Sequence, residues 1–240
     1  MGRRRGRGAA VEAGADARGP WLSAGRGHTP PSPRTARASI VQVMPKLDWI
    51  VERTQFIDGV LDAFLAEQPG RAQCVLIGSG YDTRAWRYGG SVDVYEVDLP
   101  KVVEAKTKMA AALSTPLGGG ARASLRADLK EAAGSVVDRL CAAGLRRDAP
   151  TLIVVEAVLF YLPPPTKAAL LAEFAELIGS APGSALVLTD NLAPFARSPS
   201  REATAAYVDG LGLELIDHST LWGGAIQFVH ARAPAGAAAP

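Results

Sequence analysis

Residues 74–98 read CVLIGSGYDTRAWRYGGSVDVYEVD, and the rest of the chain is organised around them. The short apolar run at 74–77 ends in two glycines, Gly78 and Gly80, which is typical of a strand buried on both faces of a parallel sheet. Neither glycine carries a Cβ, so the backbone can turn sharply there and approach a ligand closely. Asp82 follows as the predicted N-cap of a helix. The stretch therefore predicts a strand, a ligand-binding turn and a helix.

A second strand is predicted at 92–97, and two acids mark its end. Glu96 and Asp98 lie 16 and 18 residues beyond Gly80. At about this spacing an acid on the second strand reaches the ribose hydroxyls of a nucleoside. We therefore predict a nucleoside-cofactor site, and the spacing leaves the ribose contact open between Glu96 and Asp98.

The loop itself distinguishes among nucleoside cofactors. A dinucleotide-binding loop has a third glycine where this chain has Thr83, and Asp82 would place a carboxylate against the pyrophosphate. S-adenosylmethionine has no phosphate, and its sulfonium and ammonium cations suit an acidic loop. The sequence therefore favours S-adenosylmethionine as the cofactor. An alternative stays open in which Asp82 is only a helix cap.

Three ordered motifs resemble those of the leucine carboxyl methyltransferase family. They are Gly78-Ser-Gly80-Tyr-Asp82-Thr-Arg84, Tyr95-Glu96-Val-Asp98-Leu-Pro100 and Glu156-Ala-Val-Leu-Phe-Tyr161-Leu162. Members of that family are S-adenosylmethionine-dependent enzymes, and the resemblance covers about residues 49–231 with one gap. Alternating strands and helices by themselves support only an α/β fold with a parallel sheet. The resemblance implies more: a Rossmann-like sheet of seven mostly parallel strands with helices on both faces and a C-terminal antiparallel hairpin. The strands are predicted at 74–77, 92–97, 123–127, 151–156, 184–189, 213–217 and 225–231.

The resemblance also assigns roles to residues outside the glycine loop. Arg53 lies 25 residues before Gly78, where the family has an arginine that contacts the carboxylate of the cofactor's methionine part. Asp98 becomes the principal ribose contact, and Asp128 with the backbone of Leu129 flanks the adenine. From the residues alone, Arg53 is a solvated charge on a helix predicted at 49–65, which is the commoner fate of an arginine, and Asp128 is equally a helix cap.

Two further candidates lie at the end of the strand predicted at 151–156. Glu156 closes this apolar strand, and ligands of open α/β sheets bind at such ends, so we predict that it lines the cofactor site. Tyr161 lies on the loop beyond it, where a substrate approaches, and is the predicted catalytic residue. A carboxylate acceptor is already ionised and needs no general base. If the acceptor were a phenol or an alcohol, His218 and Tyr161 would be the candidate bases.

Charge is distributed unevenly along the 240 residues. Residues 1–47 hold eight Arg, one Lys, one Glu and one Asp, whereas the rest hold 17 basic and 22 acidic side chains. We predict a disordered head at 1–47, one methyltransferase domain at 48–233 and a disordered tail at 234–240. The head is alternatively an organelle-targeting segment or a nucleic-acid patch, but the acidic body makes nucleic acid an unexpected partner.

The sequence does not indicate a membrane span, a disulfide framework or a metal site. No apolar run approaches the roughly 18 residues of a membrane-spanning helix, so we expect a cytoplasmic protein unless the head directs it to an organelle. Cys74 and Cys141 are predicted to be buried thiols, and no metal site is predicted.

The methyl acceptor is the least defined element. The resemblance implies a protein C-terminal carboxylate, as in family members that methylate the C-terminal leucine of a protein phosphatase 2A-type catalytic subunit. Those members have a long segment between the fifth and sixth strands, whereas this chain has only about 20 residues at 191–212. A small-molecule acceptor, an inactive relative that binds cofactor and a nucleic-acid-associated protein are the alternatives.

Overall fold

The structure is a computed structural model that describes residues 48–68, 70–112, 119–192 and 198–234. The predicted head at 1–47 lies outside the described residues, as does nearly all of the predicted tail. The predictions for those segments stay predictions.

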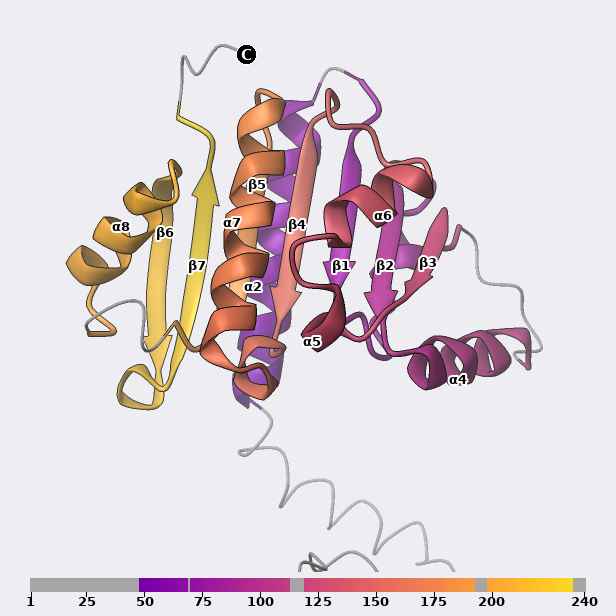
Figure 1. Cartoon of the computed structure of the whole chain (residues 1–240), viewed down its shortest axis with the longest axis horizontal. Helices are drawn as coiled ribbons and strands as arrows, with labels where there is room; N and C mark the ends of the chain where they lie inside the picture. Colours follow the sequence, from indigo (N-terminus) through magenta and orange to yellow (C-terminus); the bar gives the residue numbers. More distant parts are fainter. Residues whose placement is uncertain (1–47, 69, 113–118, 193–197, 235–240) are drawn as a thin grey trace, which may run out of the picture. The chain divides into compact units, whose positions relative to one another are not determined.

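A single seven-stranded sheet forms the centre of the fold, with the strand order β3-β2-β1-β4-β5-β7-β6 (Figure 1). Six neighbour pairings define it, of which the four among β3, β2, β1, β4 and β5 are parallel. Strand β7 runs antiparallel to both β5 and β6. The predicted Rossmann-like topology with its C-terminal antiparallel hairpin is therefore confirmed. The strands are β1 (Gln73–Ile77), β2 (Asp93–Asp98), β3 (Ala123–Arg126), β4 (Thr151–Glu156), β5 (Ala185–Asp190), β6 (Glu214–Leu221) and β7 (Ile226–Arg232).

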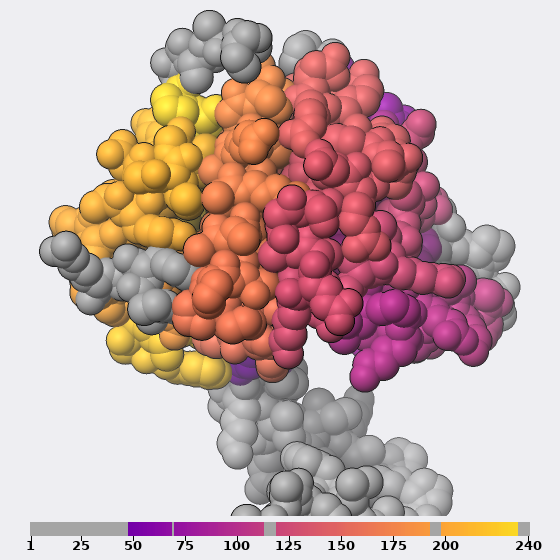
Figure 2. Space-filling model, in the orientation of Figure 1, coloured from indigo at the N-terminus to yellow at the C-terminus, as the bar shows by residue number. Residues whose placement is uncertain are grey.

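Helices cover both faces of the sheet. In Figure 1, α5, α6 and α7 lie in front of the strands and α2 lies behind them. The space-filling view of the same face shows α7 and α6 covering the middle of the sheet (Figure 2). The helices are α2 (Asp48–Glu67), α3 (Arg84–Tyr88), α4 (Pro100–Ala111), α5 (Leu129–Ala132), α6 (Val136–Ala142), α7 (Pro164–Ser180) and α8 (Arg201–Gly210).

The apolar residues 74–77 of β1 alternate between two hydrophobic cores, one on each face of the sheet. Val75 and Ile77 join the core beneath α6 and α7, whereas Cys74 and Leu76 join the core beneath α2. Every residue of β1 is buried. An uninterrupted apolar strand is what such two-sided burial requires.

Two predictions about local structure need correction. The N-cap of α3 is Thr83 rather than Asp82, although the Asp82 carboxylate does accept the Arg84 backbone N–H at 2.7 Å. Strand β6 continues four residues past its predicted end at 217, because it pairs with β7 as far as Leu221, opposite Ile226. Its outer residues are largely exposed, so apolar patterning could not reveal them.

Two further observations concern membranes and thiols. No helix in the described ranges is long and apolar enough to cross a membrane. Cys74 is buried, as predicted, whereas Cys141 on α6 is only half-buried.

Candidate cofactor site

Two cavities meet at Gly78, at the carboxyl ends of the parallel strands. The first, here called the arginine cavity, has a volume of ≈ 320 Å³ and is lined by Arg53, Gly78, Asp82, Arg84 and Glu156. The second, the aspartate cavity, is also ≈ 320 Å³ and is lined by Gly78, Asp98, Asp128, Leu129 and Tyr161. Eight of the ten predicted site residues therefore line these two adjoining cavities, and the two that do not are Gly80 and Glu96.

The glycine loop separates the cavities and leaves no room for a side chain at its first glycine. Gly78 has φ +64°, and a Cβ there would lie 2.3 Å from Cγ2 of Val158. Its N–H and that of Ser79 both donate to the Val97 carbonyl, at 2.8 and 3.1 Å, which ties the loop to β2. Gly80 also has a positive φ and donates its N–H to Asp98 at 2.7 Å. The predicted need for two glycines is met by this geometry.

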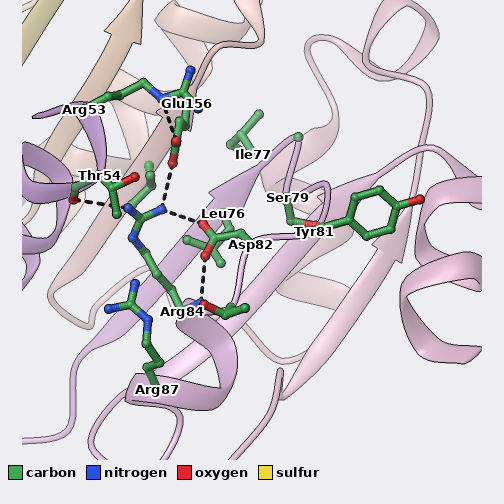
Figure 3. A pocket seen from close by; sticks show the side chains of 13 residues that line it. Arg53, Thr54, Leu76, Ile77, Ser79, Tyr81, Asp82, Arg84, Arg87 and Glu156 are labelled. Carbon is green, nitrogen blue, oxygen red and sulfur yellow. Dashed lines mark hydrogen bonds and ion pairs between the residues drawn. The ribbon is translucent and has the colours of Figure 1, made fainter. Parts of the chain in front are cut away.

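Arg84 occupies the floor of the arginine cavity (Figure 3). Its Nε lies 2.7 Å from Asp58 on α2, and its Nη1 lies 2.7 Å from both Asp82 and Glu156. The side chain is only 3 % exposed. Burial alone would lower its pKa, but the surrounding carboxylates of Asp82, Glu156 and Asp58 raise the pKa above the ordinary value. The guanidinium is therefore a permanent cation that joins three acids.

Arg53 reaches the same cavity from α2. Its Nε lies 2.7 Å from Oε1 of Glu156, and its guanidinium lies 4.9 Å from the ring centroid of Trp49. The side chain is 16 % exposed, so Arg53 is not the solvated helix charge that the residues alone allowed. Its buried Nε donates no hydrogen bond to any described residue, because the contact with Glu156 lacks hydrogen-bond geometry. Arg53 as a whole lines the arginine cavity, so its guanidinium lies beside the space that a ligand would occupy.

Glu156 ends β4 as predicted and is held on both oxygens, by Arg53 and by Arg84. The next residue, Ala157, has φ +55°, which is uncommon for a residue with a side chain. Its N–H donates to the Thr189 carbonyl on β5 at 3.1 Å. The chain therefore leaves β4 through a constrained turn directly above the site.

The acids of the aspartate cavity are held by backbone groups. The two carboxylate oxygens of Asp98 accept the N–H groups of Gly80 and Leu99, each at 2.7 Å. Asp128 is the N-cap of α5 and accepts the Lys130 N–H at 2.9 Å, so the helix-cap interpretation of this residue is confirmed. Tyr161 lies in the short 3₁₀ turn η2 (Leu159–Tyr161) and is 76 % exposed.

Asp190, at the end of β5, supports this cavity from behind. It is fully buried and accepts the backbone N–H groups of Val158 at 2.6 Å and Asn191 at 2.8 Å, and also that of Leu159. Burial raises the pKa of Asp190 to about 6, and its backbone hydrogen bonds oppose that rise. The carboxylate therefore anchors the turn that carries Tyr161.

Glu96 and His218 lie elsewhere. Glu96 forms a buried ion pair with Lys106 at 2.6 Å and borders a separate cavity of ≈ 160 Å³. Asp98, two residues later, is therefore the acid that the structure places at the predicted site. His218 contacts Thr204 and Gln227, at 3.3 and 3.4 Å, and lines neither the arginine nor the aspartate cavity.

Three participants were not singled out from the sequence: Asp58, Arg84 and Asp190. Arg84 belongs to the motif that carries the family resemblance, and that position was its available signal. Asp58 lies on the inner side of a helix whose apolar residues dominate the pattern. Asp190 follows an apolar strand, as Glu156 does, and the same argument would have selected it.

Among the described residues, no group of three or more His, Cys, Asp and Glu side chains is arranged to hold a metal ion.

The chain is similar in sequence to curated mycobacterial proteins. A Mycobacterium ulcerans protein, provisionally named an S-adenosyl-L-methionine-dependent methyltransferase, is 32% identical over 191 residues, which are 78% of this chain and 60% of that protein. A Mycobacterium sp. (strain JLS) protein with the same provisional name is 36% identical over 186 residues, 75% of this chain and 58% of the relative. The chain thus spans about 60% of the length of these curated relatives.

Solved structures share the fold at low sequence identity. A magnesium protoporphyrin IX methyltransferase from Synechocystis PCC 6803, crystallised with S-adenosylmethionine, superposes with a TM-score of 0.50 at 16% identity, covering 77% of this chain and 81% of that one. A duf574 family protein from Streptomyces avermitilis has a TM-score of 0.52 at 20% identity, covering 84% and 90%. The predicted cofactor is therefore the one named for the relatives and bound in a structural neighbour.

The profile of the leucine carboxyl methyltransferase family matches residues 15–175, about two thirds of the sequence. The three motifs that suggested this family all lie inside that match and contribute residues to the two cavities. The chain belongs to the leucine carboxyl methyltransferase family.

Proposed function

We propose that this protein binds S-adenosylmethionine across the Gly78 loop and transfers its methyl group to a carboxylate oxygen. The observation that carries the proposal is the pair of adjoining cavities, one charged and one lined by backbone-held acids and apolar groups. S-adenosylmethionine has the same two-part character, because a zwitterionic amino acid is joined through sulfur to a nucleoside.

The arginine cavity fits the amino-acid end. The guanidinium of Arg53 lines this cavity and would donate to the ligand carboxylate. Glu156 and Asp82 would receive the ammonium. The side chains of Arg53, Arg84 and Glu156 lie close together in Figure 3, so both ends of a zwitterion find an opposite charge within one cavity.

The aspartate cavity fits the nucleoside. Each oxygen of Asp98 already accepts one backbone N–H, and a carboxylate oxygen has a second lone pair for a ribose hydroxyl. Val158 and Leu162 provide apolar walls beside Asp128 and Leu129. These groups suit a purine that lies between an apolar surface and backbone polar atoms.

Bound S-adenosylmethionine would supply an electrophilic methyl carbon, and the chain's own groups would supply position and charge. Alignment of two reactants can contribute roughly 7–11 kcal/mol at best. A carboxylate acceptor arrives ionised, so Tyr161 would orient it at the open side of the aspartate cavity rather than remove a proton. The family relationship supports a protein C-terminal carboxylate, such as that of a phosphatase catalytic subunit, as the acceptor.

Calorimetric titration of the full chain tests cofactor binding. We expect heats of binding with S-adenosylmethionine and S-adenosylhomocysteine and none with NAD, whose pyrophosphate would meet Asp82. Binding of NAD with no response to the other two ligands would overturn the proposal.

The acceptor class needs a separate experiment. The protein is incubated with S-adenosylmethionine labelled in its methyl group and with a peptide that ends in leucine, and the matched control is the same peptide with a C-terminal amide. A methyl ester releases labelled methanol in mild base, whereas an ether does not. We expect base-labile label on the free acid alone. Base-stable label on a phenolic small molecule would instead identify the alternative acceptor.

Cellular location and the role of residues 1–47 belong to the proposal as well. We place the activity in the cytoplasm, with import into an organelle as the alternative that the basic composition of residues 1–47 raises. Fluorescent fusions of the full chain and of a chain beginning at residue 48 would distinguish the two.

A further inference from the structure

Arg84 is almost completely enclosed by protein groups, although it borders the arginine cavity. Asp58, Asp82 and Glu156 each accept from it at 2.7 Å, and its Nη2 lies 3.5 Å from the Thr54 carbonyl. The side chain is 3 % exposed. An arginine has five N–H donors, and these contacts use all three of its nitrogens. Because its nitrogens are already engaged, Arg84 would act on a ligand mainly through these partners.

Two of those partners are the acids that line the arginine cavity, Asp82 and Glu156. They approach the same nitrogen, Nη1, from the glycine loop and from β4 respectively. Like charges this close disfavour ionisation of one another, and a cation between them removes that penalty. Asp58 anchors the opposite side of the guanidinium through Nε and so connects both acids to α2.

We propose that Arg84 is a positioning residue that holds Asp82 and Glu156 in place for the ammonium of the ligand's amino-acid end. This inference rests on the proposed function and concerns one part of the ligand only. The nucleoside end lies in the aspartate cavity, to which Arg84 contributes no lining atom. Loss of Arg84 should therefore weaken recognition of the amino acid and leave recognition of the nucleoside unchanged.

The planar guanidinium is essential to this role. Its Nε donates to Asp58 on α2, whereas its Nη1 contacts the two cavity acids, Asp82 and Glu156 (Figure 3). A lysine ammonium carries the same charge but cannot offer donors at the separate fixed positions of Nε and Nη1. Arg84→Lys therefore separates geometry from charge and avoids leaving three carboxylates without a cation.

The test compares two ligands. S-adenosylhomocysteine carries the amino acid, whereas 5′-methylthioadenosine has the same nucleoside and sulfur without it. For Arg84→Lys we expect a loss of about 30-fold or more in affinity for S-adenosylhomocysteine, as for other disrupted buried charge pairs, and a change of less than about twofold for 5′-methylthioadenosine. Equal losses for the two ligands, or no loss for either, would overturn the inference.

The control is Arg71→Lys, because Arg71 also forms an ion pair, with Asp93 at 2.7 Å, but is half-exposed and lies at the other end of β1. Each variant is titrated well below its own unfolding midpoint. Wild-type protein that binds neither ligand would overturn the proposed function and this inference with it. Selective loss in Arg84→Lys would support both.

A double-mutant cycle with Glu156→Gln gives a second readout that a purely structural role would not change. If Arg84 acts through Glu156, the loss caused by Arg84→Lys should be at least about fivefold smaller in the Glu156→Gln background. The same loss in both backgrounds contradicts positioning of Glu156. If 5′-methylthioadenosine binds too weakly for titration, this cycle alone tests whether Arg84 acts through Glu156.

Discussion

The arginine cavity and the aspartate cavity hold their acids with different partners. In the first, Glu156 and Asp82 are bound by side chains, those of Arg53 and Arg84. In the second, Asp98 is bound by the backbone N–H groups of Gly80 and Leu99, and Asp128, the other acid of that cavity, accepts the Lys130 N–H. Backbone donors persist when any residue other than proline occupies a position, whereas a guanidinium is lost with a single substitution. The arginine cavity should therefore be the more fragile of the two.

Substitution of Arg53 should produce the largest effect. Arg53→Ala removes a proposed partner of the ligand carboxylate and should lower S-adenosylmethionine affinity by about 2–5 kcal/mol, or roughly 30- to several-thousand-fold. Arg53→Lys should recover only part of this, because an ammonium cannot present a planar pair of donors. Calorimetry at matched salt measures all three proteins, and equal affinities would refute the role of Arg53.

The second prediction concerns Asp190 and the pH dependence of the free energy of unfolding. Burial raises its pKa from the ordinary value of 3.8 to about 6, so the folded protein binds this proton more tightly than the unfolded chain. The stabilisation is present in full below about pH 4 and is lost as the pH rises through 6, a change of about 3 kcal/mol.

We therefore expect wild type to gain about that much stability relative to Asp190→Asn between pH 7 and pH 4. Urea unfolding of both proteins at several pH values measures the difference, in which the titration of all other groups cancels. A difference that stays constant with pH would show that Asp190 does not titrate in this range.

Asp98 and Glu96 allow a direct comparison within one strand. Asp98→Ala should weaken S-adenosylhomocysteine binding by roughly 1.5–3 kcal/mol for each hydrogen bond lost to the charged acceptor. Glu96→Ala should leave that affinity nearly unchanged and lower the free energy of unfolding, because it strands the buried Lys106. The reverse pattern in titration and urea unfolding would reassign the ribose contact to Glu96.

The smallest effect is expected at Asp128. Asp128→Ala removes the cap of α5 and should lower the free energy of unfolding by about 1 kcal/mol, whereas Asp128→Asn should retain it. Chemical denaturation of the two variants measures this. Comparable losses in both would show that the carboxylate charge, rather than the cap, is what stabilises the helix.

The pattern of apolar residues in the sequence was sufficient to predict where most strands of the sheet lie. The apolar runs of β1 and β4 are recognisable because both of their faces are buried, and each predicted strand overlaps an observed one. Strand β6 is longer than predicted. It is an edge strand whose outer residues are largely exposed, and pairing with β7 determines where it ends. Pairing partners cannot be deduced from the strand's own residues.

The site residues could be predicted only where their distance along the sequence from the glycine loop identifies them. Glu96 and Asp98 both satisfied the spacing expected of a ribose contact, and the choice between them depends on Lys106, which lies on α4 and occupies Glu96. The association of Arg84 with Asp58 and Glu156 was likewise invisible. It joins residues far apart in the chain and depends on how α2 and β4 pack against β1.

The same association determines when the site can form during synthesis. Arg84 follows Asp58 by 26 residues but precedes Glu156 by 72. At about 5–20 residues per second, translation takes roughly 4–14 s to supply that last acid. Until β4 arrives, the guanidinium stays in water, because burying it with an incomplete set of acids costs several kcal/mol. The glycine loop of a nascent chain should therefore remain open to proteases until Glu156 has left the ribosome.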